Sequence, residues 1–504
     1  MAEKIEIDPI TRIEGHLAVS VEVEEGRVAR AFCKGEMFRG FELILKGRDP
    51  LDAQQITQRI CGVCPVSHGM ASVLAQEQAY GITPNENGRL VRNLILGANY
   101  LQSHIIHFYH LSAVDFIDLE AIAQYQGKDA ALNEFKAWVG TQKASSVVAP
   151  GAPFLPRYAG DYLDGTDANI TAIKHYLEGL RMRALAHQMA ALFAGKLPHV
   201  ASLVPGGVTE RVTTQKIAAY GAMLQELRSF INRSYLPDVM SVAAGFPSYF
   251  KLGKGCGNFL AYGAFAESAD NSRKYLPAGV VIGGRLAEFD PRQITEDVKY
   301  SYYQSASGLA PAAGQTVPRP GKPDAYTWLK APRYKGMAME VGPLSRILIA
   351  YLSGTDPEVR QAVDHGLNQL NRSTEDLDSA MGRHAARAIE CKLVADQCAR
   401  WLDQLKPGEP ACVDFTIPRS GQGVGLCEAP RGALGHWLAI DDYKIASYQC
   451  VVPTTWNCSP KDDQGHPGPV EQALIGTPIA NAAQPIEAAR VVRSFDPCLA
   501  CAVH

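Results

Sequence analysis

Hydrophobic and polar residues alternate with a period of two near the start of the chain, over about residues 4–34. The run Leu17-Ala-Val-Ser-Val-Glu-Val shows this alternation, and the pattern breaks at Glu25-Gly26. Such a pattern predicts a strand hairpin. A second β-type pattern, over about 411–457, predicts strands near the end of the chain.

Between these segments the apolar residues recur with helical spacing. Helical patterns cover about 88–116, 168–195, 211–234, 355–371 and 374–405. Asp167 and Ser373 are the expected N-caps of two of these helices, and Gly195 and Pro407 are expected stops. Residues 240–345 are rich in Gly, Pro and Tyr, and they predict irregular structure with short strands.

These patterns predict an α+β fold, in which a large core of long helices is flanked by β-rich N- and C-terminal segments. We expect residues 1–504 to form one interdependent unit. Its parts are a β-rich segment (1–70), a mainly helical core (85–406) with an irregular insertion (240–345), and a second β-rich segment (407–504). Length alone would favour about three domains, but strands on both sides of the helices can bring the two chain ends to one site.

The composition is that of a folded globular protein, with 46% hydrophobic and 20% charged residues. The net charge of −3 gives no argument for a nucleic-acid or anionic-membrane partner. No uninterrupted apolar run reaches the roughly 18 residues of a transmembrane helix. The start, Met-Ala-Glu-Lys-Ile-Glu-Ile-Asp, lacks the basic and apolar regions of a signal peptide.

Two pairs of cysteines lie near opposite ends of the chain, Cys61-Gly-Val-Cys64 and Cys498-Leu-Ala-Cys501. Four thiols favour a soft-metal site, because thiolates bind nickel, copper(I), zinc or iron. The alternative is a structural zinc, but zinc ribbons place their pairs about 15–20 residues apart, whereas almost the whole chain separates these two. Each pair is followed by a histidine, as expected where neighbouring groups orient reactive thiolates. We therefore predict a buried metal centre that joins the chain ends.

The remaining cysteines are too sparse for a disulfide scaffold in a chain of this length. Most of them are expected to be small buried hydrophobic residues, which is the commonest role of a free cysteine. These residues are Cys33, Cys256, Cys391, Cys398, Cys412, Cys427, Cys450 and Cys458.

Longer strings surround both pairs, Arg59-Ile-Cys-Gly-Val-Cys-Pro-Val-Ser-His68 and Asp496-Pro-Cys-Leu-Ala-Cys-Ala-Val-His504. Together with the strings at 8–16, 428–432 and 452–457, they resemble the signatures of the large subunit of nickel–iron hydrogenases. The resemblance spans the whole chain. It implies a catalytic subunit that reversibly cleaves H2 into two protons and two electrons, a reaction that requires a Lewis acid beside a base.

The resemblance assigns the ligands of a nickel–iron centre. It implies that Cys61 and Cys498 are terminal nickel ligands, and that Cys64 and Cys501 bridge nickel and iron. It also implies carbon monoxide and two cyanides on iron. Buried cyanides need hydrogen-bond donors, and the residues implied to bind this part of the cofactor are Arg431, Pro453 and Thr454. Ser103 stands where many relatives carry an aspartate, which leaves open how Arg431 is positioned.

Two further side chains take roles beside the thiols in the same resemblance. Glu14 is implied to lie next to Cys498 and to receive its proton, and burial in a dry site would raise the pKa of this carboxyl. His68 is implied to donate a hydrogen bond to a bridging sulfur. The alternatives are a solvated glutamate on a strand edge and a core histidine that bonds to the backbone.

A second, isolated cation is implied near the end of the chain. Its protein ligands would be Glu42, His504 and the backbone carbonyl of Cys450, a donor set that suits magnesium or ferrous iron. The alternative is an unrelated surface glutamate and a frayed chain end.

Partners and location also follow from the resemblance. We expect an iron–sulfur small subunit docked near residues 59–68, because the remaining cysteines form no cluster that fits an iron–sulfur centre of this chain's own. A maturation endopeptidase would cut a precursor after His504, and a cytochrome is a candidate electron acceptor. The pair is expected to be exported to the periplasm, or to the periplasmic face of the membrane, on the partner's signal. A cytoplasmic location is the alternative.

Several stretches resemble the selenium-containing branch of the family, namely Leu101-Gln-Ser-His, Met381-Gly-Arg-His-Ala-Ala-Arg387 and Trp456-Asn-Cys-Ser-Pro-Lys-Asp-Asp463. That branch carries selenocysteine at the position of Cys498. We expect a true cysteine here, exposed enough to suffer oxidation. Three other functions compete with catalysis: a hydrogen sensor, a respiratory-complex subunit and a zinc-stapled structural protein. Respiratory-complex relatives lack the four cysteines.

Overall fold

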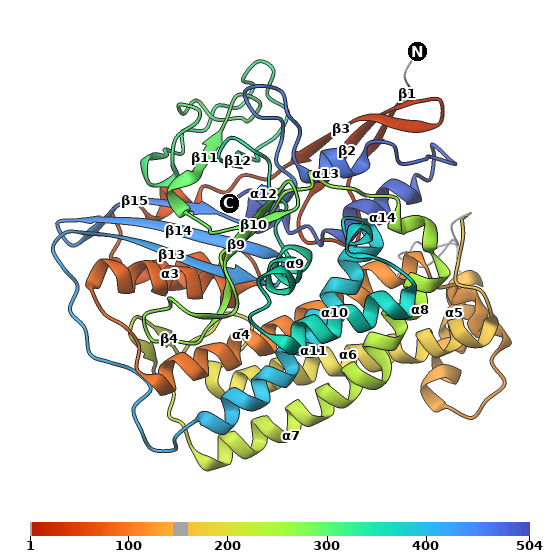
Figure 1. Ribbon diagram of the computed structural model, residues 1–504, viewed down its shortest axis with the longest axis horizontal. Coiled ribbons are helices and arrows are strands. Elements are labelled where there is room, and N and C mark those ends of the chain that lie inside the picture. Colours follow the sequence, from red (N-terminus) through yellow and green to blue (C-terminus); the bar gives the residue numbers. More distant parts are fainter. Residues whose placement is uncertain (1–2, 145–159) are drawn as a thin grey trace.

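Long helices form the lower half of the molecule in the computed structural model, which describes residues 3–144 and 160–504 (Figure 1). Six of them pack side by side, with α4 and α11 each against several neighbours. They are α4 (Glu86–Ile106), α6 (Thr166–Ala194), α7 (Thr214–Phe230), α8 (Leu236–Gly245), α10 (Pro357–Leu370) and α11 (Ala380–Gln404). The prediction of an α+β fold with a helical core is confirmed.

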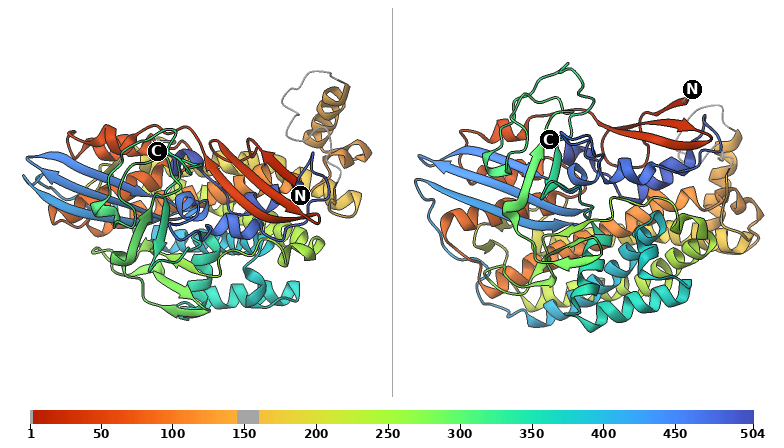
Figure 2. Two further views of the ribbon diagram at one scale, coloured as in Figure 1. Left: turned by 90° about the horizontal axis from the view of Figure 1, so that it is seen from above. Right: turned by 45° about the horizontal axis from the view of Figure 1, so that its top comes forward.

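Two three-stranded antiparallel sheets lie above the helices, and the C-terminus lies between them (Figures 1 and 2). The first contains β1 (Glu3–Ile7), β2 (Leu17–Glu24) and β3 (Arg27–Gly35). The second contains β13 (Gly421–Ala429), β14 (Gly432–Asp441) and β15 (Lys444–Val451). The predicted hairpin at 4–34 is therefore part of a three-stranded sheet.

Short strands and further helices form the other elements of the described chain. Residues 203–334 contain β4–β12 as strands of two to four residues: Leu203–Val204, Gly207–Val208, Phe259–Ala261, Ala264–Ala266, Lys274–Leu276, Gly279–Ile282, Arg285–Ala287, Ile294–Asp297 and Ala331–Tyr334. The other helices are α1 (Phe41–Leu45), α2 (Asp52–Gln58), α3 (Pro65–Tyr80), α5 (Ala130–Ala144), α9 (Pro343–Ser353), α12 (Pro453–Asn457), α13 (Pro469–Leu474), α14 (Ile486–Ser494) and α15 (Leu499–Ala502). Among the described residues, no helix combines the length and the apolar composition needed to cross a bilayer.

The structure differs from the predicted elements at both ends of the chain. Residues 41–80 form helices α1–α3 where a β-rich segment was expected, and α12–α15 occupy the last fifty residues. In α12, Pro453 takes the first helical position, where its missing N–H costs nothing. The organisation of residues 1–504 as one interdependent unit stays a prediction.

Helix boundaries correct two predicted caps. Gly165, with φ 91°, precedes α6, so Asp167 lies in the first turn, where its charge still favours the helix. Ser373 caps the short 3₁₀-helix Thr374–Leu377, and α11 begins later, with Ser379 as its N-cap. Gly195 ends α6 as predicted, whereas α11 ends at Gln404, ahead of Pro407.

The second sheet packs directly onto helix α3 through two glycines of β13. A Cβ atom built on Gly423 would lie 1.8 Å from the carbonyl oxygen of Ala75, and one on Gly425 would lie 1.9 Å from that of Ala71. Both neighbours are backbone atoms, so no side chain can move aside. Small residues at these two positions therefore let the strand approach the helix that follows the first cysteine pair.

We expect Gly423→Ala to lower the free energy of unfolding by at least about 1–3 kcal/mol, because the added methyl forces β13 away from α3. Thermal unfolding of the purified protein measures the change. Gly140→Ala on α5 is the control, since a Cβ there meets nothing within 4 Å. Equal stability of the two variants would contradict this packing.

Candidate metal centre

The four predicted thiols converge on one buried point. Cys61 and Cys64 lie in the loop between α2 and α3, Cys498 is the N-cap of α15, and Cys501 lies within α15. The sulfur atoms of Cys61 and Cys498 are 3.4 Å apart, those of Cys64 and Cys501 are 3.0 Å apart, and those of Cys498 and Cys501 are 3.1 Å apart. The two chain ends therefore supply one four-sulfur cluster.

This cluster fits a metal better than it fits four protonated thiols. Two sulfurs bound to one ion at about 2.3 Å lie roughly 3.3–3.8 Å apart, close to the separations found. Hydrogen bonds from Cys498, Cys501 and Cys64 hold the pKa of the Cys61 thiol well below its usual value, while burial raises those of Cys498 and Cys501. Four soft donors in a dry pocket suit nickel and iron.

Glu14 lies beside the cluster, at the place that the sequence predicted. Its Oε2 accepts from the Cys498 thiol at 3.1 Å and from the Ala500 N–H at 3.0 Å. Burial, followed by the charge of Cys61, raises the pKa of this carboxyl. Cys498 is only 1% exposed, so the expectation of an exposed ligand is wrong.

His68 contacts the cluster from the first turn of α3. Its Nε2 is 3.3 Å from Cys501 Sγ, and its Nδ1 is 3.2 Å from Nε2 of His436. The other nitrogen of His436 is 2.8 Å from the Tyr448 hydroxyl. Burial lowers the pKa of His68 to about 3, so its ring is neutral. Sequence reasoning missed His436 and Tyr448, which lie on β14 and β15 outside every motif.

Arg431 is fixed by an aspartate that sequence reasoning gave no role. Its Nη2 is 2.9 Å from Asp496 Oδ1, and its Nε donates to the Asp496 carbonyl at 3.0 Å. Ser103 Oγ is a longer contact, at 3.5 Å. Burial would lower the pKa of Arg431, but Asp496 and the thiolates outweigh it and raise the pKa. Asp496, two residues before Cys498, therefore positions the guanidinium, and Ser103 contributes only the longer contact.

Helix α12 carries Pro453 and Thr454 to the same pocket. The Thr454 hydroxyl oxygen accepts from the backbone N–H of Cys498 at 2.9 Å, which leaves its own proton free for another acceptor. The next residue, Thr455, donates to the carbonyl of Ala502. These contacts join α12 to the segment that carries the second cysteine pair.

Glu42, Cys450 and His504 form a second buried group of metal-binding type. Glu42 Oε1 accepts from the backbone N–H of Cys450 at 2.7 Å and lies 3.2 Å from His504 Nε2. Burial would raise the pKa of Glu42, but Lys330 and His504 outweigh it and lower the pKa to about 2. A surface glutamate with a frayed chain end is therefore excluded. The predicted carbonyl ligand stays a prediction.

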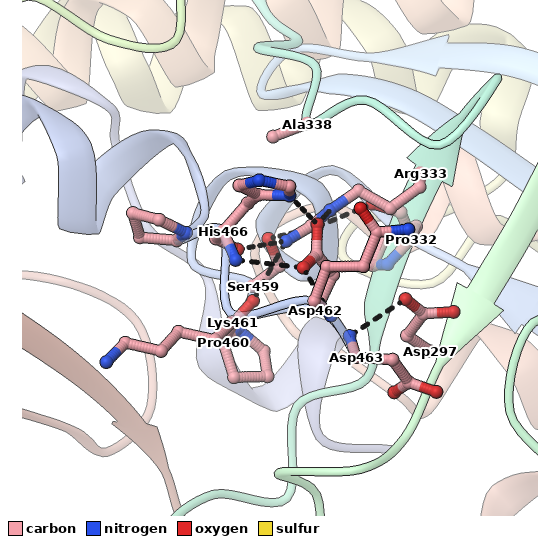
Figure 3. Close-up of polar contacts among 12 residues, drawn as sticks. Asp297, Pro332, Arg333, Ala338, Ser459, Pro460, Lys461, Asp462, Asp463 and His466 are labelled. Atoms are coloured by element: carbon pink, nitrogen blue, oxygen red, sulfur yellow. Dashed lines mark hydrogen bonds and ion pairs between the residues drawn. The ribbon is translucent and has the colours of Figure 1, made fainter.

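A network around Arg333 holds the loop that follows α12 (Figure 3). The guanidinium is 1% exposed and donates to Ser459 Oγ at 3.1 Å, to the His466 carbonyl at 3.0 Å and to Asp462 Oδ2 at 3.2 Å. Figure 3 also shows the backbone N–H of Asp463 directed at Asp297, at 3.1 Å. Strands β11 and β12 thus anchor the loop that directly follows α12, the helix that carries Thr454.

We expect Arg333→Lys to lower the free energy of unfolding by about 1–3 kcal/mol, because an ammonium cannot replace the planar fork of donors and leaves buried oxygens around it unpaired. Thermal unfolding measures the loss, and hydrogen exchange locates it at residues 453–466. The matched control is Arg292→Lys, whose side chain is 86% exposed beside Asp290 and should change little. Equal effects of the two variants would reject the anchoring role.

Known proteins resemble this chain over almost its whole length. The profile of the family described as nickel-dependent hydrogenase matches residues 39–504, and a HoxL-like profile matches residues 4–34. The chain is 43% identical to the periplasmic [NiFeSe] hydrogenase large subunit of Desulfomicrobium baculatum, over 99% of this chain and 95% of that protein. It is 34% identical to the hydrogenase-2 large chain of Escherichia coli strain K12, over 100% and 97% respectively.

Solved structures of hydrogenases also resemble this chain over its full length. The H2-activated [NiFeSe]-hydrogenase of Dm. baculatum matches with a TM-score of 0.89 and 43% identity, over 100% of both chains. The reduced Ni-Fe-Se hydrogenase of D. vulgaris Hildenborough matches with a TM-score of 0.89 and 42% identity, over the same coverage.

Proposed function

This chain is a large subunit of the nickel-dependent hydrogenase family, an oxidoreductase that acts on H2, and we propose that its four thiols hold a nickel–iron centre with carbon monoxide and two cyanides on iron. Cys61 and Cys498 would be terminal ligands of nickel, and Cys64 and Cys501 would bridge the two metals. The observation that carries the proposal is the four-sulfur cluster, with sulfurs 3.0–3.4 Å apart, assembled from both chain ends.

The side chains around the cluster have different roles in the cleavage of H2. When bound, the metal centre supplies the Lewis acidity at which H2 is split. Cys498 Sγ holds the released proton, and Glu14 Oε2 accepts it across 3.1 Å. Burial raises the pKa of both groups, which brings Glu14 closer to the range of a general acid–base near neutral pH.

Arg431 and Thr454 would donate hydrogen bonds to the two cyanides. Each has a donor that its protein contacts do not use up, and both lie in a pocket where an unpaired anion would be costly. Pro453 precedes Thr454 in α12 and has no backbone N–H that could compete with Thr454 for a cyanide. His68, with a neutral ring, would donate through Nε2 to Cys501 and so lower the charge density on a bridging sulfur.

The second group would hold a cation that fixes the C-terminal residues near the centre. Glu42 and His504 are both buried, and His504 lies three residues after Cys501. Ferrous iron and magnesium are the candidate ions, with the Cys450 carbonyl as a further ligand.

Large subunits of this family pair with a small subunit, and we propose that the partner here carries iron–sulfur clusters and docks near residues 59–68. Support comes from four exposed apolar side chains on and around α1, shortly before the first cysteine pair: Met37, Leu43, Ile44 and Leu51. Exposed apolar groups of this kind mark protein interfaces. A cytochrome would accept the electrons from the partner.

We also propose a location in the periplasm or at its membrane face, because the Desulfomicrobium baculatum relative is periplasmic. Export would occur together with the small subunit, and a maturation endopeptidase would act on the precursor after His504. Fractionation of cells tests the location. Recovery of the folded pair from the cytoplasm would contradict it and leave the chemistry untouched.

The function is tested by infrared spectra and metal analysis of the purified heterodimer. We expect nickel, with carbonyl and cyanide stretches, in the wild type, and loss of nickel and of activity in Cys61→Ser and Cys64→Ser. Cys412→Ser is the control, because this partly exposed cysteine lies outside the cluster. Nickel retained in an active Cys61→Ser variant would reject the ligand assignment. Selenium in stoichiometric amount would show that residue 498 is selenocysteine in the native protein.

We expect Glu14→Gln to reduce turnover by roughly 100-fold or more, because the amide keeps the shape of the side chain but cannot carry a proton. The infrared bands of the metal site should persist, which separates a lost relay from a lost centre. Glu24→Gln, at an exposed position at the end of β2, is the control. Normal turnover of Glu14→Gln would show that another group accepts the proton from the cluster.

A further inference from the structure

Helix α3, which packs against the second sheet, carries a row of polar side chains on one side (Figure 1). The row has a spacing of four residues, which places its members next to one another on the helix surface: His68, Ser72, Gln76 and Tyr80. The first three are buried, and Tyr80 is partly exposed. His68 lies beside the metal cluster, and Tyr80 is the last residue of the helix. The row therefore runs from the cluster along the whole length of α3.

Hydrogen bonds connect the members of this row to the sheet. The Tyr80 hydroxyl donates to Gln76 Oε1 at 3.2 Å, and Gln76 Nε2 donates to Ser72 Oγ at 3.2 Å. The Ser72 hydroxyl hydrogen-bonds in turn to the hydroxyl oxygen of Tyr448 on β15. Each hydroxyl in this part of the chain can accept one bond and donate another.

The direction of donation is fixed at the sulfur end of the chain. A sulfur that bridges two metals is a thiolate without a proton, so Cys501 Sγ only accepts and His68 Nε2 carries the proton. A neutral ring has one N–H, so His68 Nδ1 accepts from His436 Nε2 at 3.2 Å. Nδ1 of His436 is then also an acceptor, and the Tyr448 hydroxyl donates to it at 2.8 Å. Donation therefore runs one way, from tyrosine through two imidazoles to the sulfur.

The chemistry of the chain excludes two other roles. Both imidazoles are at most 1% exposed, and burial lowers the pKa of His436 well below its usual value, so a cationic ring is disfavoured. Gln76 interrupts any route for protons to the surface, because an amide does not release and take up protons as a hydroxyl or an imidazole does. The chain is therefore suited to orient donors, and not to conduct protons.

We propose that Tyr448 and His436 are positioning residues for the bridging sulfur, because they hold His68 in the tautomer that donates to Cys501. Successive hydrogen bonds polarise one another, so a chain of donors makes the last donor stronger. A stronger donor withdraws charge from the sulfur and, through it, from the metals. This inference rests on the proposed function, since it needs a metal-bound thiolate, and it adds two residues outside the motifs to the groups that act on the centre.

Infrared spectra of the purified heterodimer test the proposal. Tyr448→Phe leaves Nδ1 of His436 without its donor, so the sulfur gains charge and the carbonyl and cyanide bands should shift to lower wavenumber at unchanged nickel content. Ser72→Ala removes a link farther from the sulfur and should cause a smaller shift in the same direction. Tyr220→Phe is the matched control: it also removes a buried hydroxyl, which donates to the Leu94 carbonyl at 2.9 Å in the helical core, and should shift no band.

Unshifted bands in both Tyr448→Phe and Ser72→Ala would overturn the inference, as would an equal shift in Tyr220→Phe. If Tyr448→Phe fails to retain nickel, Ser72→Ala decides, because that variant keeps the tyrosine and both histidines. Absence of carbonyl and cyanide bands from the wild type would reject the proposed function and the inference with it. Bands that are present in the wild type and unshifted in the variants reject only the role of Tyr448 and His436.

Discussion

The pairing of the two chain ends is the constraint on which the site depends. Glu14 and Cys498 form an isolated parallel bridge, in which Leu499 N donates to the Glu14 carbonyl at 2.8 Å. Gly15 follows with φ 78°, and a Cβ there would lie 2.7 Å from the backbone nitrogen of Ala500. A glycine is therefore required for the close approach. This backbone contact holds the Glu14 carboxylate beside Cys498.

Buried ion pairs hold the elements around the centre in one arrangement. Arg346 is fully buried on α9 and binds Glu390 of α11 and Glu428 of β13, at 2.6 and 2.7 Å. Burial would raise the pKa of Glu390, but Arg346 outweighs it and lowers the pKa to about 2. Such pairs contribute little net stability, yet removal of one partner leaves an uncompensated charge at a cost of about 3–5 kcal/mol. The helical core and the second sheet are thus locked together close to Arg431.

The two groups proposed to transfer the proton differ in how deeply they are buried. Cys498 is almost completely buried, whereas Glu14 is half-buried. A carboxyl at this boundary contacts the dry thiol cluster on one side and the molecular surface on the other. The same pocket keeps water from the thiols, which strengthens each hydrogen bond to them. In the proposed mechanism, the proton therefore leaves the cluster through this half-buried carboxyl.

From the sequence alone, the two cysteine pairs predicted one metal site, and the resemblance to the hydrogenase family implied the positions of Glu14, Arg431, Glu42 and His504 around it. The sequence also predicted long helices, since the apolar residues of α4 and α10 recur with helical spacing. Only the tertiary structure decided the roles of His436 and Asp496. Each of them contacts a residue that is distant in the chain, and such a contact leaves no periodic signal in the sequence. Helices α1 and α12 span only five residues each, too few for a period to appear, so long-range packing and capping decided them as well.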